Sequence, residues 1–262
     1  MKLISLAAIV QALVLAGCSD RPDPPPVLPS QTAALPLSAG RGVGIDMPTD
    51  ASDVIYELKD ANVEFVARYY RDPGSKWPPL SPSEAQRLSS LGLKIVAVYE
   101  YHSPRPAHFT YDWGYNDALT AYGQARAVGQ PIGSAIYFAA DFHARYDDLA
   151  SVVEYFRGIH AGLATAGAGA EVYAVGVYGS APVCDAVRAA RLARYSWLSN
   201  SITWDDGADY EDWNIMQGAS LPGLSVNNDS DQARSDYGAF VVAPSTPTLM
   251  PVSAPMETSN SE

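Results

Sequence analysis

The 262-residue sequence predicts a single α/β domain of the (β/α)8, TIM-barrel-like class with irregular later repeats. Two observations lead to this prediction. Eight short runs of apolar residues, most of them unbroken, are typical of parallel strands that are buried on both faces. Between the earlier runs lie stretches in which apolar residues recur every three or four positions, as in amphipathic helices. Eight strands with helical crossovers favour a closed barrel, and a doubly wound open sheet is the competing interpretation.

The elements are predicted in order along the chain. Strands are expected at residues 43–46, 64–70, 94–101, 135–141, 172–178, 195–198, 213–217 and 224–229. Helices are expected at residues 48–61, 81–91, 115–128, 149–165 and 181–194. The second helix has the clearest start, because Ser81 and Glu84 have the spacing of a capping box and Pro82 occupies the first helical position. The later connections are shorter and irregular.

The first 17 residues predict a lipoprotein signal peptide. Lys2 supplies a positive start, and residues 3–16 form an apolar run that is broken only by Ser5 and Gln11. This run is shorter than the roughly 20 apolar residues that span a bilayer. It ends in Leu-Ala-Gly followed by Cys18, which resembles the lipidation site of bacterial lipoproteins. An ordinary secretory signal with an incidental cysteine is the alternative.

We therefore expect an exported protein that is anchored to the cell envelope by lipid on Cys18, at the outer membrane or at the outer face of the cytoplasmic membrane. Residues 18–39 contain six prolines and few large apolar side chains, which predicts an extended tether. Residues 244–262 are rich in proline, serine and threonine and predict a disordered tail. The barrel domain is expected between them, at residues 40–243.

The composition limits the partners of the protein. Its formal net charge of −12 excludes nucleic acid, because contact with phosphates requires a basic face. The same charge disfavours docking on anionic lipid, so the membrane is expected to be reached through the lipid anchor alone. With Cys18 lipidated, Cys184 has no cysteine partner, and we interpret it as a small buried residue rather than a catalytic thiol. No cofactor and no bound metal are expected.

Polar and aromatic residues gather at the ends of the predicted strands. In a (β/α)8 barrel the carboxyl ends of the strands meet at one mouth, where the chemistry lies. The residues in or next to these ends are Asp46, Arg68, Tyr70, Glu100, Tyr101, Asp141, His143, Tyr178, Trp197, Gln217 and Asp229. Carboxylates serve as acids and bases or bind hydroxyl groups, and aromatic rings stack on the apolar faces of sugars. The pattern therefore predicts a carbohydrate site.

Each carboxylate also has a structural interpretation. Asp46 has the position of a helix cap, Glu100 is compatible with a solvated loop, and Asp141 with a cap or an ion pair. Asp229 and Asp231 follow each other so closely that the sequence does not separate their roles.

Several of these segments together resemble one family. They are Gly44-Ile45-Asp46, the run Phe-Val-Ala-Arg-Tyr-Tyr at 65–70, Ile-Tyr-Phe-Ala-Ala-Asp at 136–141, Val-Gly-Val-Tyr-Gly at 175–179, Tyr-Ser-Trp-Leu at 195–198 and the region of Gln217. The chain is similar in these segments to the glycoside-hydrolase-like barrels that were formerly catalogued as a domain of unknown function. That family is similar in turn to the lysozymes of glycoside hydrolase family 25. The resemblance implies a barrel that acts on the glycan of peptidoglycan.

The resemblance also implies roles for single residues. Asp46 matches the strand-one aspartate of those lysozymes, Asp141 the first carboxylate on strand four and Asp229, approximately, the late-strand aspartate. The lysozymes place their general acid, a glutamate, two positions after the strand-four aspartate, where this chain has His143. Glu100 on the neighbouring strand is the candidate to replace that acid.

We therefore expect an envelope-anchored glycosidase-like protein that acts on peptidoglycan or a related amino-sugar polymer. Its expected catalytic carboxylates are Asp46, Glu100, Asp141 and Asp229. Its expected substrate-binding residues are Arg68, Tyr70, Tyr101, His143, Tyr178, Trp197 and Gln217, of which Arg68 is also interpreted as an ion-pair partner that holds the carboxylates. The alternative is a cleft that binds cell-wall glycan without cutting it. A third hypothesis is a metal-assisted deacetylase that uses Asp141 and His143.

Overall fold

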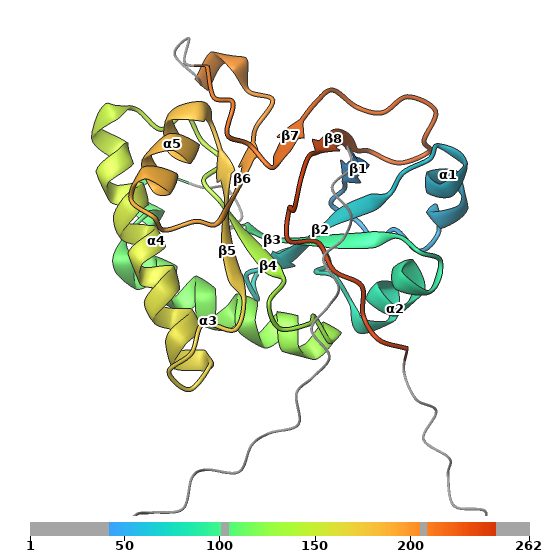
Figure 1. Cartoon of the computed structure of the whole chain (residues 1–262), viewed down its shortest axis with the longest axis horizontal. Coiled ribbons are helices and arrows are strands. Elements are labelled where there is room, and N and C mark those ends of the chain that lie inside the picture. Colours follow the sequence, from blue (N-terminus) through green and yellow to red (C-terminus); the bar gives the residue numbers. More distant parts are fainter. Residues whose placement is uncertain (1–41, 101–104, 205–208, 245–262) are drawn as a thin grey trace, which may run out of the picture. The chain divides into compact units, whose positions relative to one another are not determined.

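The computed structural model describes residues 42–100, 105–204 and 209–244, whose eight strands form a closed barrel (Figure 1). The strands are β1 (Gly42–Asp46), β2 (Phe65–Arg71), β3 (Lys94–Glu100), β4 (Ala135–Ala139), β5 (Ala174–Gly179), β6 (Tyr195–Leu198), β7 (Ile215–Gln217) and β8 (Asp229–Ala233). Each strand pairs with the next along the chain, and β8 pairs with β1. The predicted barrel class is confirmed, and the open sheet is wrong because every strand has two neighbours.

The last strand, β8, runs antiparallel to both of its neighbours, whereas β1 to β7 are parallel to one another. Its first residue, Asp229, pairs with Asp46 at the end of β1. The strand predicted at residues 224–229 is wrong except for Asp229, because residues 224–228 form a loop in which Asn228 makes hydrogen bonds to the backbone. The Asn228 Oδ1 accepts a hydrogen bond from the backbone N–H of Leu221 at 2.9 Å. The polar strand therefore begins only where this loop ends.

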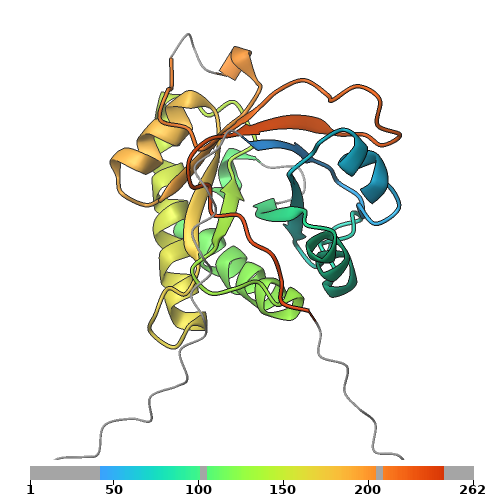
Figure 2. The ribbon, with the colours of Figure 1, turned by 45° about the vertical axis from the view of Figure 1, so that its right-hand side comes forward.

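Five α-helices lie around the barrel in the described residues. They are α1 (Ile55–Asp60), α2 (Pro82–Ser90), α3 (Tyr111–Val128), α4 (Tyr146–Ala166) and α5 (Ala181–Ala189). Figure 2 shows α3, α4 and α5 gathered on one side and α1 and α2 on the other. After β6 the described connections contain only the short 3-10 helix Ile202–Trp204, which confirms the irregular later repeats. No helix in the described ranges is long and apolar enough to cross a membrane.

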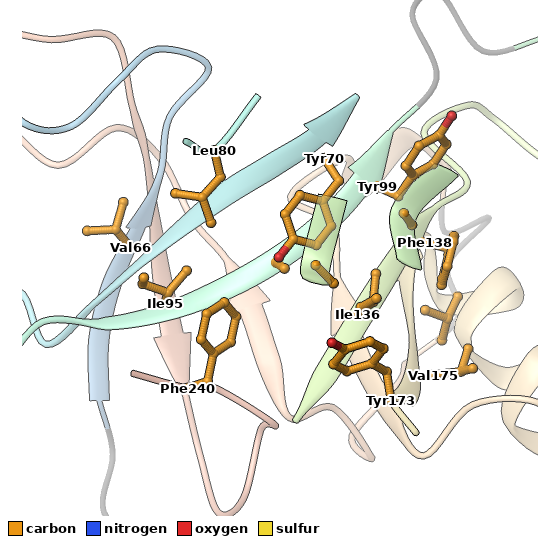
Figure 3. Packing of buried hydrophobic residues seen from close by; sticks show 14 of the residues in the cluster. Val66, Tyr70, Leu80, Ile95, Tyr99, Ile136, Phe138, Tyr173, Val175 and Phe240 are labelled. Carbon is orange, nitrogen blue, oxygen red and sulfur yellow. The ribbon is translucent and has the colours of Figure 1, made fainter. Parts of the chain in front are cut away.

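Side chains alternate between two apolar cores along each strand. Residues that point into the barrel, such as Phe65 and Trp197, form the inner core. Residues that point outward, such as Ile95 and Val175, belong to the second core, which includes the apolar faces of the helices (Figure 3). The inner core leaves no room for a side chain at Gly44, where a Cβ atom would overlap the ring of Phe65. Below the mouth the barrel is thus packed solid.

The helices α3 and α4 approach each other closely because glycines lie at their contact. A Cβ atom on Gly114 would overlap the carbonyl of Tyr155, and one on Gly158 would overlap the carbonyl of Tyr111. Backbone meets backbone at this crossing. Cys184 of α5 is fully buried, which confirms its interpretation as a core residue.

The segment after β8 runs along the face of the barrel where the parallel strands begin. The backbone N–H of Ala135, the first residue of β4, donates to the carbonyl of Gly238 at 2.9 Å. Phe240 forms a bridge with Ile95 at the start of β3. Farther on, the backbone N–H of Val242 donates to the Oγ of Ser89 in α2 at 2.9 Å. The chain therefore closes the barrel face that lies opposite the mouth.

Candidate functional site

A cavity of about 410 Å³ opens at the mouth of the barrel, which we call the main lobe. It is lined by Asp46, Tyr69, Val98, Glu100, Ala139, Asp141, Tyr178, Trp197, Asn200, Ser201, Trp204, Gln217 and Asp229. Most of these residues stand at the carboxyl ends of β1 to β7, and Asp229 joins them because antiparallel β8 begins at the mouth. Four carboxylates from four parts of the chain therefore share one cavity.

A second cavity of about 270 Å³, which we call the side lobe, adjoins the first. The two lobes share four lining residues, Asp46, Tyr69, Glu100 and Asp229. The side lobe adds Pro48, Arg71, Trp77, Asn227 and Asn228. Tryptophans line both lobes, with Trp204 and the buried Trp197 in the main lobe and the exposed Trp77 in the side lobe. The lobes together form a cleft at the mouth that contains the shared carboxylates and aromatic side chains.

Asp46 is held from two sides. The hydroxyl of Tyr69 donates to its Oδ1 at 2.8 Å, and the Nε2 of Gln217 donates to its Oδ2 at 2.8 Å. Gln217 is itself oriented by the hydroxyl of Tyr178, which donates to its Oε1 at 3.0 Å. Burial raises the pKa of Asp46 to about 6, the two hydrogen bonds lower it in part, and the charges of Asp229 and Asp141 raise it. Side chains from β1, β2, β5 and β7 are thereby joined into one hydrogen-bonded chain.

Glu100 forms an ion pair with Arg71 on the adjacent strand. The Nη1 of Arg71 lies 3.3 Å from the Oε2 of Glu100. Burial raises the pKa of Glu100 to about 7, Arg71 opposes this shift, and the charges of Asp141 and Asp46 add to it. Close to neutral pH this carboxyl group therefore exists both with and without its proton.

Asp141 and Asp231 are two further carboxylates near the mouth with raised pKa values. Burial raises the pKa of Asp141, and a hydrogen bond from Tyr178 lowers it in part. Asp231 is fully buried below the mouth, and burial together with the charge of Asp46 raises its pKa well above the ordinary value. Asp229 lines both lobes whereas Asp231 lines neither. The structure therefore separates the two neighbours, with Asp229 in the cleft and Asp231 beneath it.

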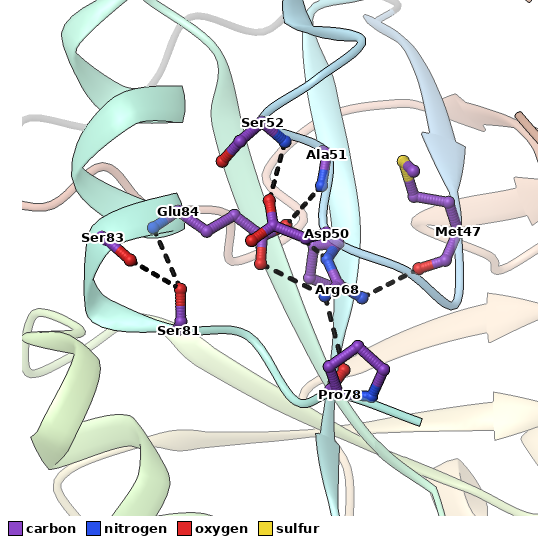
Figure 4. Close-up of polar contacts among 9 residues, drawn as sticks. All are labelled: Met47, Asp50, Ala51, Ser52, Arg68, Pro78, Ser81, Ser83 and Glu84. Atoms are coloured by element: carbon purple, nitrogen blue, oxygen red, sulfur yellow. Dashed lines mark hydrogen bonds and ion pairs between the residues drawn. The ribbon is translucent and has the colours of Figure 1, made fainter. Parts of the chain in front are cut away.

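Two predicted substrate-binding residues on β2 point away from the cleft. The guanidinium of Arg68 is fully buried against α2, where its Nη2 lies 3.2 Å from the Oε2 of Glu84 and its Nε contacts the Oε1 (Figure 4). Its Nη1 also donates to the carbonyl of Met47 at 3.0 Å. Tyr70 is equally buried, and its hydroxyl donates to the Oε1 of Gln130 at 2.7 Å. Arg68 therefore does not hold the carboxylates of the cleft, and both side chains are occupied on the outer face of the barrel.

Three further residues predicted for the site or the anchor are His143, Tyr101 and Cys18. His143 follows β4 in a loop, is half-buried, and is not among the residues that line either lobe. Tyr101 and Cys18 lie outside the described residues. Within those residues, no group of three or more histidine, cysteine, aspartate or glutamate side chains is arranged to hold a metal ion.

Four further side chains of the cleft are not among the predicted site residues: Tyr69, Arg71, Trp77 and Trp204. On β2 the missing information was the strand face. Each face of residues 65 to 71 carries one tyrosine and one arginine, so alternation alone does not say which face points inward. The pairing of Arg71 with Glu100 in the strand register settles that face. Trp77 and Trp204 lie in connections between strands, where no periodic pattern predicts the direction of a side chain.

A larger hollow of about 770 Å³ lies beside α4, α5 and the start of β5. Several of its charged side chains already have partners of opposite sign. Arg188 pairs with Asp212 at 2.9 Å, and His160 contacts Glu171 at 2.7 Å. The cleft at the mouth, where carboxylates with raised pKa values converge, is the better candidate for chemistry.

Residues 56–238 match the family model described as Rv2525c-like, glycoside hydrolase-like domain. The uncharacterized protein FadG of Bacillus subtilis (strain 168) is 31% identical over 183 residues, which cover 67% of this chain and 31% of FadG. The Mycobacterium tuberculosis protein named "Putative peptidoglycan hydrolase Rv2525c" is 32% identical over 146 residues, which cover 50% of this chain and 58% of that protein. The matches thus span less than two thirds of the length of either relative.

The crystal structure of the Tat-secreted protein Rv2525c in complex with L-tartrate has the same fold. The two structures give a TM-score of 0.65 at 24% identity, covering 76% of this chain and 98% of the other. A family 25 glycosyl hydrolase from Bacillus anthracis gives a TM-score of 0.44 at 14% identity, covering 75% of this chain and 93% of the other.

Proposed function

The chain belongs to the family of Rv2525c-like, glycoside hydrolase-like domains, and from this premise we propose that its cleft hydrolyses the glycan of peptidoglycan or of a related amino-sugar polymer. The name of Rv2525c refers to peptidoglycan hydrolysis. The observation that carries the proposal is the presence of Glu100 and Asp141 in one cavity, with the pKa of Glu100 raised to about 7. Hydrolysis of a glycosidic bond requires two such carboxyl groups in different protonation states.

Glu100 is the proposed general acid. A catalytic acid works best when its pKa lies near the working pH, because it then holds a proton and still releases it readily. Burial beside Asp141 and Asp46 brings Glu100 into this range. Lysozyme-type enzymes use the same principle, in which two carboxyl groups acquire different roles from different surroundings.

Asp141 is the proposed partner of Glu100. Glu100 ends β3, and Asp141 follows the end of the neighbouring strand β4 by two residues. Both side chains line the main lobe. Two carboxyl groups in one cavity can act on opposite sides of one bond. Asp141 would stabilise positive charge at the anomeric carbon or orient the acetamido group of the substrate.

Asp46 and Asp229 are proposed to bind substrate hydroxyl groups. Both oxygens of Asp46 already accept hydrogen bonds from the protein, so its role is to hold position and charge rather than to move a proton. The rings of Trp77 and Trp204 are proposed to stack on sugars in the side lobe and the main lobe. The cleft would thus take several sugar units of a chain that passes across the mouth.

A rival function is binding of cell-wall glycan without cleavage. The observation in its favour is His143, which stands where the related lysozymes have their glutamate and which does not line either lobe. In this case the carboxylates and tryptophans of the cleft would still bind the polymer, and Glu100 would remain only an ion-pair partner of Arg71.

Turnover of purified peptidoglycan, with products identified by mass spectrometry, separates the two functions. New reducing ends that disappear in Glu100→Gln and in Asp141→Asn support hydrolysis. Glu154→Gln is the matched control, since this carboxylate lies in an exposed ion pair on α4. Binding of intact glycan without new reducing ends rejects hydrolysis and leaves the binder. Release of acetate that depends on a divalent ion instead indicates the deacetylase.

The protein is also proposed to be exported and anchored by lipid on Cys18. The support is the coincidence of Lys2, the apolar run 3–16 and the small residues before the cysteine. Rv2525c is described as a secreted protein. Incorporation of labelled fatty acid and fractionation of membranes test the anchor, because Cys18→Ser should lose both the label and the membrane association. A Cys18→Ser protein that stays fully in the membrane fraction contradicts it.

A further inference from the structure

Arg71 is the only cationic side chain among the described residues that line the cleft. The main lobe contains none, and the side lobe contains Arg71 together with the exposed Trp77 and the shared carboxylates. The guanidinium is almost inaccessible to solvent, because the residue is 6% exposed. A single buried positive charge in an otherwise acidic cleft calls for a specific role.

The backbone of Arg71 is fixed while its guanidinium is held weakly. The side-chain amide of Gln124 in α3 bonds to both backbone polar groups of Arg71, at 3.0 and 2.7 Å. The guanidinium lies 3.9 Å from the ring centroid of Tyr69 and makes one contact of 3.3 Å with Glu100. Its Nε is buried and has no hydrogen-bond partner in the described part of the chain. A buried donor of this kind is expected to find an acceptor, and the planar fork of arginine fits a carboxylate.

We propose that the guanidinium of Arg71 binds a carboxylate of the bound glycan in the side lobe. Arg71 then stabilises the substrate carboxylate instead of the ionised form of Glu100, so binding leaves Glu100 protonated and ready to act as acid. This inference rests on the proposed function of the cleft and adds a coupling between substrate recognition and proton uptake. Arg71 is in this scheme a positioning residue for Glu100 and a specificity residue for acidic sugars. The proton comes from solvent, and no covalent bond changes.

The surroundings of Glu100 explain why the coupling has this direction. The groups that face it are Arg71 and Tyr69 from β2, Asp46 from β1, Asp141 from the loop after β4, Tyr178 from β5 and Asp229 from β8. All of them except Arg71 are carboxyl or phenol groups. A carboxylate that neutralises Arg71 therefore removes the sole charge that favours the ionised form of Glu100.

Calorimetric binding measurements test this inference with three ligands, of which only the first carries carboxyl groups. The ligands are a tetrasaccharide of alternating N-acetylglucosamine and N-acetylmuramic acid, its carboxyl-reduced counterpart and chitotetraose. We expect the acidic ligand to bind about tenfold more tightly than the reduced one, as for a charged hydrogen bond. Titrations in buffers of different ionisation enthalpy measure the number of protons bound. At pH 7 the acidic ligand should cause an uptake of about half a proton at most, since Glu100 of the free protein is already half protonated.

Variants assign these effects to residues. Arg71→Gln should bind all three ligands with similar affinity and without proton uptake, while Glu100→Gln should keep the preference for the acidic ligand and lose only the uptake. Arg87→Gln removes the same charge from an exposed position on α2 and should behave as wild type. If Arg71→Gln does not fold, Arg71→Lys carries the test. The ammonium group of lysine lacks the planar fork of the guanidinium, so the preference for the acidic ligand over the reduced one should fall at least about threefold.

The results separate this inference from the proposed hydrolysis. Equal binding of the acidic and reduced ligands by wild type, a preference that survives in the Arg71 variants, or no binding of any ligand overturns the inference. Turnover of peptidoglycan without the preference leaves hydrolysis intact. Preference and proton uptake without turnover leave the inference intact and reject hydrolysis.

Discussion

Asp46, the last residue of β1, lies directly opposite Asp229, the first residue of β8. The two residues are 183 positions apart in the chain, and the antiparallel course of β8 is what brings them together at the mouth. A parallel eighth strand would have carried Asp229 to the opposite face of the barrel, because it is the first residue of its strand. The reversal of one strand thus completes the ring of carboxylates around the cleft.

The pH dependence of turnover is predicted by the carboxyl groups of the cleft. Glu100 must hold its proton, so kcat/KM should fall above its pKa of about 7, by about tenfold per pH unit. Asp141 must be ionised, so the rate should also fall on the acid side, at a pH above the ordinary aspartate range. Release of reducing ends between pH 4 and 9 measures both limbs. A rate that stays level from pH 7 to 9 is incompatible with Glu100 as the acid.

Gln217→Leu should reduce turnover with a small loss of stability. The variant takes one of two hydrogen bonds from Asp46 and removes the bond between Tyr178 and residue 217. The pKa of Asp46 should rise further, because burial is then opposed by Tyr69 alone. We expect kcat/KM to fall about tenfold and stability to fall by about 1 kcal/mol, the usual value of one hydrogen bond. Steady-state kinetics and urea unfolding measure the two effects, and unchanged kinetics would show that the bonded chain around Asp46 is dispensable.

Arg68→Met should destabilise the fold by about 3 to 5 kcal/mol, because it leaves the carboxylate of Glu84 buried without its partner. The double variant Arg68→Met with Glu84→Leu should recover most of this loss, since it removes both charges together. Arg157→Met is the matched control. Its ion pair with Glu154 is exposed, so its loss should cost less than about 1 kcal/mol. Urea unfolding compares the three, and equal losses in Arg68→Met and Arg157→Met would contradict the structural role of Arg68.

Asp117 should make the protein more stable at mildly acidic pH than at neutral pH. Burial raises its pKa to about 6, which hydrogen bonds from Tyr155 and Tyr99 only partly oppose. The folded protein therefore binds more protons than the unfolded chain between about pH 4 and 6, and this contribution is full below that window and lost above it. The difference is about 3 kcal/mol for a shift of about two pKa units.

The variant Asp117→Asn isolates this effect from the other carboxyl groups. It should be more stable than wild type by about 1 to 3 kcal/mol at pH 7.5, because it carries no buried charge, and equally stable at pH 4. Thermal unfolding across this range measures the difference. A difference that is the same at both pH values would assign the effect to packing rather than to ionisation.

The barrel could be predicted because parallel strands buried on both faces leave unbroken apolar runs, as in Ile-Tyr-Phe-Ala of β4. The eighth strand could not, since its sequence Asp-Ser-Asp-Gln-Ala contains almost no apolar residue. Its ladder with β1 and β7 holds it in place, and Asp229 and Asp231 point inward. The strand predicted at residues 224–229 therefore overlaps the true strand only at Asp229.

Residues of the cleft could be predicted where the end of a parallel strand could be predicted. Asp46, Glu100, Asp141 and Gln217 each stand at or next to the end of a parallel strand, and the structure places all four in the main lobe. The prediction failed on β2, whose arginines Arg68 and Arg71 differ only in the face on which they lie. Which of them points inward depends on pairing with β3, and that pairing is a property of the sheet rather than of the segment.

Both ends of the described domain lie on the side away from the cleft. The chain enters β1 at Gly42, four residues below the mouth, and after β8 it follows the opposite face as far as α2. A tether joined before Gly42, or a further domain joined beyond residue 244, would therefore be attached to the closed side of the barrel. With both ends on the closed side, attachment of the chain to a surface would leave the open end of the barrel accessible to a polymer ligand.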